Sequence, residues 1–138
     1  MAPTDREEHA ERAGPPARLT VRTRPGPGNG PVVLAVAGEL DHDTAAPLRE
    51  ALARTDASAR VVVDCSGLRF CDSTGLNVLL RARLRLNESG GRLDLAGLRP
   101  PVDRMFEITG ARSIFRVYGD ATDALADTAD PADGRSDA

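Results

Sequence analysis

The chain is poor in aromatic residues and contains no lysine. Three Phe, one Tyr and no Trp occur among 138 residues, so the core of a folded domain must be aliphatic. The sequence also lacks any run of about 18 uncharged apolar residues, which excludes an ordinary membrane-spanning helix. Hydrophobic residues still make up 41% and charged residues 28% of the chain. This balance is typical of a soluble globular protein.

Cysteine and histidine are scarce as well. The N-terminus has no apolar central region of the kind found in secretory signals, so we expect a cytoplasmic protein with reduced thiols. Cys65 and Cys71 are then expected to be small core residues. The two histidines, His9 and His42, give at most a weak ligand set with them. We therefore predict no metal site and no cofactor.

The two ends of the chain differ in composition from its centre. Residues 1–16 contain no Val, Leu, Ile or Phe, and residues 127–138 are rich in Asp, so both are predicted to be disordered tails. The tails carry net charges of −2 and −3, whereas residues 17–126 carry +2. Those residues are predicted to form one domain. Because no basic cluster is interleaved with aromatic residues, we expect no binding to nucleic acid.

Apolar and polar residues alternate between the patterns of strands and helices along residues 17–126. Strands are predicted at 19–23, 32–37, 60–64, 93–96 and 114–118, and helices at 44–55, 73–87, 100–109 and 121–126. Ser66 and Gly67 are read as a turn, and Leu76, Leu79, Leu80 and Leu84 as the buried face of the second helix. This order predicts an α/β fold with a mixed, mostly parallel sheet of about five strands and about four helices.

The most informative segment is Asp72-Ser73-Thr74-Gly75, where a buried strand leads into a helix. Asp72 is a preferred N-cap residue, and Ser73 and Thr74 fall in the first turn, where unpaired backbone N–H groups favour an anion. A phosphoryl group on Ser73 would be tolerated there. Spacing alone fits a purely structural cap equally well. Gly75 implies that either the helix packs tightly on a strand or another molecule approaches closely.

Several motifs resemble those of one known family. The matching residues are Gly38-Glu39-Leu40-Asp41, Thr44-Ala45, Leu48 to Leu52, Asp64, Ser66-Gly67, Phe70, Asp72 to Leu76, Val78 to Leu80, Leu95 to Leu98 and Val102 to Gly110. Together they resemble the anti-anti-sigma factors (anti-sigma factor antagonists), whose STAS domain also occurs in sulphate-transporter tails. The resemblance spans about residues 17–126, all of the predicted domain.

The resemblance implies a binding protein that is switched by phosphorylation. Its unmodified form would bind an anti-sigma factor with serine kinase activity and so release a sigma factor, and a serine phosphatase would reverse the modification. Ser73 corresponds to the modified serine, with Thr74 as an alternative acceptor. The implied partner-binding residues are Glu39, Asp41, His42, Asp72, Ser73, Thr74, Gly75 and Asn77. A monomer or weak dimer without membrane contacts is expected.

Two other functions are compatible with parts of the sequence. An enzyme with Ser73 as nucleophile would need a Gly-x-Ser-x-Gly elbow and a His/Asp pair, and the chain has neither, so we predict no catalytic activity. A scaffold in a signalling or lipid-transport complex would keep the fold without a phosphorylation switch. Arg81 and Arg85 share one helix face, which is either solvated or part of a partner-contact stripe.

Overall fold

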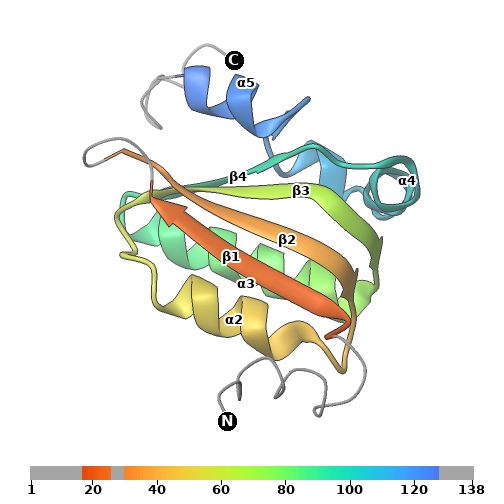
Figure 1. Cartoon of the computed structure of the whole chain (residues 1–138). Coiled ribbons are helices and arrows are strands. Elements are labelled where there is room, and N and C mark those ends of the chain that lie inside the picture. The colour runs from red at the N-terminus through yellow and green to blue at the C-terminus, as the bar shows by residue number, and fades with distance from the viewer. Residues whose placement is uncertain (1–16, 26–29, 128–138) are drawn as a thin grey trace, which may run out of the picture.

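The computed structural model describes residues 17–25 and 30–127. Its centre is one five-stranded sheet with the order β1-β2-β3-β4-β5 (Figure 1). β1 and β2 are antiparallel, and β3, β4 and β5 continue the sheet in parallel with β2. The strands are β1 (Leu19–Pro25), β2 (Val32–Leu40), β3 (Arg60–Cys71), β4 (Arg92–Ala96) and β5 (Val117–Tyr118). The predicted α/β class is confirmed. The predicted tails at 1–16 and 127–138 lie outside the described residues, except for Asp127, whose carbonyl accepts a hydrogen bond from Arg60.

Helices connect the parallel strands and cover both faces of the sheet. They are α2 (Ala45–Ala53), α3 (Ser73–Glu88), α4 (Pro100–Thr109) and α5 (Ala121–Ala126), with a 3-10 turn at Ala111–Ser113. α2 and α3 lie side by side under one face, and α5 lies on the other (Figure 1). Each crossover returns the chain to the same edge, so the C-terminal ends of β2 and β3 meet where α2 and α3 begin.

The core is aliphatic, as the scarcity of aromatic residues predicts. Leu34, Leu40, Leu48 and Leu86 are completely buried between the sheet and the helices. Phe106 is the largest fully buried side chain. The apolar side chains of the strands alternate between this main core and a smaller cluster beneath α5, made of Val33, Val62, Ala96 and Ala124.

Two predictions about the central segment are wrong. Ser66 and Gly67 form no turn, because β3 continues for 12 residues to Cys71. Register shifts in the pairing with β2 bend this strand, and Gly67 lets it approach Ala37, since a Cβ there would lie 2.8 Å from the Ala37 Cβ. Leu84 is 57% exposed and not part of the buried face of α3, which is continued by Ala82 and Leu86 instead.

The last strand is also shorter than predicted. Only Val117 and Tyr118 pair with β4, whereas the preceding residues leave α4 through the 3-10 turn. Gly110 ends α4 in the left-handed region, at φ 83°, which redirects the chain. Phe115 then points into the core and Ile114 stays 45% exposed. The apolar character of this segment therefore reflects anchoring of a loop more than strand formation.

Candidate functional site

The segment Asp72-Ser73-Thr74-Gly75, called the switch segment below, lies at the start of α3. Asp72 is its N-cap, and the Asp72 Oδ1 accepts a hydrogen bond from the Gly75 N–H at 3.0 Å. Ser73 is the first helical residue and is exposed. Within the described residues, the Ser73 hydroxyl has no hydrogen-bond partner. The hydroxyl is therefore open to solvent beside the positive end of a 16-residue helix.

The loop between β2 and α2 lies directly beside this segment. The second carboxylate oxygen of Asp72 accepts a hydrogen bond from the His42 N–H at 3.3 Å, and the Asp72 N–H donates to the Leu40 carbonyl at 3.1 Å. The structure thus brings together two stretches that are 30 residues apart in sequence. His42 is exposed, and its contact with Asp72 is through the backbone, not the imidazole.

The same loop is held by Asp41 and by a residue that sequence reasoning missed. Asp41 accepts hydrogen bonds from the Asp43 and Thr44 N–H groups at 2.9 and 3.1 Å. Arg18 reaches across from the start of β1 and pairs with both Asp41 and Glu39. Partial burial opposes ionisation of Asp41, but these hydrogen bonds and the Arg18 charge outweigh it and lower the pKa of Asp41. Arg18 reaches these two carboxylates because β1 pairs with β2, a long-range contact that has no local signal in the sequence.

Thr44 belongs to the same loop and directly precedes α2. It occupies the N-cap position of α2, but its side chain makes no capping hydrogen bond. Instead the Thr44 hydroxyl donates to the Glu39 carbonyl at 2.7 Å and accepts from the Asp41 N–H at 2.9 Å. The hydroxyl therefore stabilises the loop rather than the helix end.

The structure explains Gly75 by packing. A Cβ at this buried position would lie 2.5 Å from the Leu40 Cγ and 3.1 Å from the Cys71 Sγ. The first turn of α3 therefore rests directly on the ends of β2 and β3. This contact fixes the height of Ser73 and Thr74 above the sheet, so the exposed hydroxyl has a defined position on the surface.

Cys65 and Cys71 are free and buried, which confirms the prediction that they are core residues. Burial raises the pKa of the Cys71 thiol to about 12, and the nearby Asp72 charge adds to this effect. The pKa of Cys65 is raised further by complete burial. Both thiols are therefore protonated and poorly nucleophilic at neutral pH.

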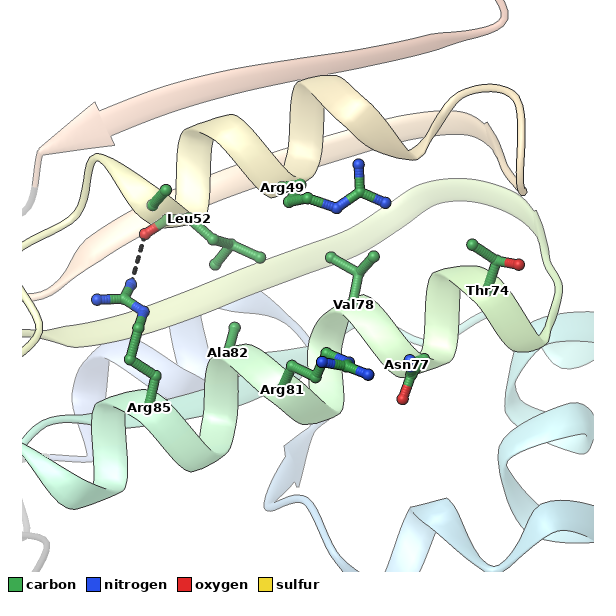
Figure 2. Close-up of a pocket in the computed structure, with 9 residues that line it drawn as sticks. Arg49, Leu52, Thr74, Asn77, Val78, Arg81, Ala82 and Arg85 are labelled. Carbon is green, nitrogen blue, oxygen red and sulfur yellow. Dashed lines mark hydrogen bonds between the residues drawn. The ribbon is translucent and has the colours of Figure 1, made fainter.

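A groove of about 480 Å³ runs between α2 and α3 and reaches the switch segment (Figure 2). Its apolar lining includes Leu52, Val78 and Ala82, and Thr74 and Asn77 lie at the end nearest Ser73. Three arginines line it: Arg49 of α2 with Arg81 and Arg85 of α3. The groove therefore combines an apolar lining with positive charge, which the sequence indicates only as a shared face for Arg81 and Arg85.

The described residues carry no cluster of three or more His, Cys, Asp or Glu side chains that could hold a metal ion. No helix in this part of the chain has the length and apolar character needed to cross a membrane.

The protein is therefore an α/β domain with two surface features. One is the exposed Ser73 hydroxyl at the start of α3, and the other is the groove between α2 and α3, which is both apolar and positively charged. The family model described as "Mlab, STAS domain" matches residues 28–116. The chain therefore belongs to the STAS domain family, the family of the anti-sigma factor antagonists. The predicted resemblance is confirmed.

Curated relatives and a solved structure agree with this assignment. An anti-sigma F factor antagonist of Paenibacillus polymyxa is 32% identical over 100 residues, which are 70% of this chain and 85% of the relative. An anti-sigma-B factor antagonist of Staphylococcus aureus is 33% identical over 84 residues, covering 59% and 78%. The crystal structure of an anti-sigma factor antagonist from Mycobacterium paratuberculosis, 28% identical, superimposes with a TM-score of 0.70 over 82% of this chain and 98% of that one.

Proposed function

We propose that this protein is a cytoplasmic, non-catalytic anti-sigma factor antagonist controlled by phosphorylation of Ser73. In its unmodified form it binds an anti-sigma factor that is also a serine kinase, and the sigma factor held by that partner is released. The partner phosphorylates Ser73 and so ends the complex, and a serine phosphatase restores the hydroxyl. The observation that carries this proposal is the exposed Ser73 hydroxyl, unpartnered among the described residues, directly after the N-cap of α3.

The position of Ser73 suits a switch that acts through the surface. A phosphoryl group adds about −1.5 to −2 charge at neutral pH. At a helix N-terminus this charge is favoured by the helix dipole and the free N–H groups, so α3 stays folded. What changes is the surface offered to the partner, where new charge at a desolvated contact is costly.

The surface around Ser73 supplies the remaining contacts of the proposed interface. It comprises Glu39, Asp41, His42, Asp72, Thr74 and Asn77, the last of which is exposed on the next turn of α3, with the predicted Gly75 directly beneath it. Gly75 contributes by letting the turn pack closely and not by direct contact, because it is buried. Thr74 is half-buried and lines the groove, which makes it a poorer acceptor than Ser73.

Ser73 is proposed as a substrate of the partner rather than as a nucleophile. Within the described residues, no imidazole or carboxylate accepts a hydrogen bond from its hydroxyl, and a serine without such a base is weakly nucleophilic. The Asp72 carboxylate is already occupied by the Gly75 and His42 N–H groups. In the proposed reaction, the kinase therefore supplies the base that activates the hydroxyl.

The experiment is phosphorylation by a kinase-type anti-sigma factor with ATP, followed by peptide mapping by mass spectrometry. We expect one phosphoryl group, on Ser73, in the wild type and in Thr74→Ala, and none in Ser73→Ala. A modification that persists in Ser73→Ala and maps to another residue would refute the assignment of the site. Stable binding to other proteins that is unchanged in Ser73→Glu would favour the scaffold function.

A further inference from the structure

Most of the groove between α2 and α3 lies outside the surface assigned to the partner, which shares only Thr74 and Asn77 with it. Its rim carries Arg49, Arg81 and Arg85, and no acidic side chain lines it. Arg85 donates to the Leu52 carbonyl at 2.7 Å (Figure 2), whereas Arg49 and Arg81 have no carboxylate partner within the described part of the chain. Unpaired guanidinium groups beside an apolar floor favour a ligand that is both acidic and partly apolar.

The chain itself contains a strongly acidic segment, whose one apolar residue is Ala10. Residues 5–11, Asp-Arg-Glu-Glu-His-Ala-Glu, hold four acids and one Arg, a net charge of −3 with neutral histidine. This matches the three positive charges of the groove. Between Thr74 and Arg85 the groove follows about 16 Å of helix. A segment of seven residues spans about 23 Å when extended, which is sufficient to follow it.

The point where the chain enters the domain is close to the groove. The Arg18 carbonyl accepts a hydrogen bond from the Glu39 N–H at 2.8 Å, and the Arg18 guanidinium pairs with Asp41. The neighbouring His42 N–H bonds to Asp72, two residues before Thr74 at the end of the groove. Residues 12–17, the six that join Glu11 to Arg18, can span about 20 Å. Residues 5–11 are therefore within reach of the groove.

The acidic residues at the other end of the chain are placed less favourably. The Asp127 carbonyl accepts a hydrogen bond from Arg60, at the start of β3, whereas α3 begins after the far end of that strand. α5 also lies on the face of the sheet opposite α2 and α3 (Figure 1). Residues 128–138 would have to pass around the sheet to reach the groove.

We propose that residues 5–11 bind in the groove between α2 and α3 of the same molecule, with their carboxylates paired to Arg49 and Arg81. The contact is electrostatic and therefore sensitive to salt. It places negative charge beside Thr74 and Asn77, at the edge of the surface assigned to the partner. If the proposed function also holds, the N-terminal segment competes with the partner; the binding of the segment itself does not depend on that function.

The test uses the full chain with a nitroxide spin label on Ala10→Cys, since Cys65 and Cys71 are buried and resist labelling. We expect the amide NMR signals of Asn77 and Arg81 to lose intensity, while that of Arg104 on α4 is unaffected. The loss should disappear when residues 5, 7, 8 and 11 are changed to their amides, and in 1 M salt, where the Debye length is about 3 Å.

Matched variants distinguish the proposal from other contacts. Arg49→Gln with Arg81→Gln should abolish the signal loss, and Arg104→Gln should leave it unchanged. Three results would overturn the proposal. The first is no selective loss at Asn77 and Arg81, and the second is a loss that survives neutralisation of the acidic residues. The third is an equal loss in an isotopically enriched chain without nitroxide when it is mixed with a nitroxide-bearing chain without isotope enrichment. The last result would assign the groove to a second copy. None of these measurements involves a kinase, so a failure here is separate from a failure of the phosphorylation switch.

Discussion

The carboxylate of Asp72 joins the backbone of His42 to the first turn of α3. One oxygen accepts the Gly75 N–H at 3.0 Å, and the other accepts the His42 N–H at 3.3 Å. A single side chain therefore caps the helix and fixes the adjacent loop. Because Ser73 lies between these two contacts, its orientation depends on both.

Loss of this side chain should be measurable as a loss of stability. Asp72→Ala removes the N-cap, which typically costs about 0.5–2 kcal/mol of unfolding free energy. Asp72→Asn keeps an oxygen acceptor and should cost less. Urea denaturation of both variants measures the difference. Asp120→Ala, which removes the similar side-chain cap of α5, serves as a reference for the size of the loss. Equal stability of Asp72→Ala and the wild type would contradict the role of Asp72 as a cap.

Gly75→Ala should destabilise the protein although alanine favours helices. The added methyl would lie 2.5 Å from the Cγ of the completely buried Leu40, so the overpacking cost of about 1–3 kcal/mol exceeds the helix-propensity gain of about 1 kcal/mol. Gly119→Ala, outside the helices, is a control for the crowding alone, since its Cβ would lie at an ordinary contact distance of 3.6 Å from Asp123.

A second variant separates the clash from other effects of Gly75→Ala. In the background of Leu40→Ala, which removes the crowding atoms, Gly75→Ala should be less destabilising than in the wild type. Thermal denaturation of the four proteins gives the coupling energy between the two positions. Additive effects would show that the contact with Leu40 is not the reason for the glycine.

The buried thiols make stability fall at alkaline pH. Their pKa values are raised in the folded state, to about 12 for Cys71, above the ordinary value of about 8.5 in the unfolded chain. Their contribution is therefore fully present below about pH 8.5 and declines as pH rises toward the folded pKa, by up to about 1.4 kcal/mol per pH unit for each thiol. Urea denaturation between pH 7 and 10 should show a smaller decline in Cys71→Ala. Identical pH profiles would contradict the burial of an un-ionised thiol at this position.

The sequence predicts most of the fold because its signals are local. Asp72 is identified as the cap of α3 by its place between a buried strand and an apolar helix, and the structure confirms it. Features set by long-range packing were missed or misread. Ser66 and Gly67 look like a turn, yet they belong to β3, which carries an extra residue there relative to β2 and continues to pair with it. Leu84 fits a helical apolar stripe, but it is exposed, and Ala82 and Leu86 continue the buried face of α3 instead.

The candidate site also contains both residues with a local sequence signal and residues that only long-range packing brings to it. Ser73 and the loop at Glu39–His42 could be predicted from their motifs, although only the fold shows that Asp72 contacts His42. Arg18 and Arg49 carry no local signal. Arg18 reaches Asp41 because β1 pairs with β2, and Arg49 faces Arg81 because α2 packs against α3.

The affinity for a kinase-type anti-sigma factor, measured by calorimetry before and after modification of Ser73, tests the account most directly. The wild type and Ser73→Ala should bind equally well. The protein phosphorylated on Ser73 should bind at least about tenfold more weakly, a difference of about 1.4 kcal/mol, because a new charge enters the contact. Equal affinity of the phosphorylated and unmodified forms would contradict the account.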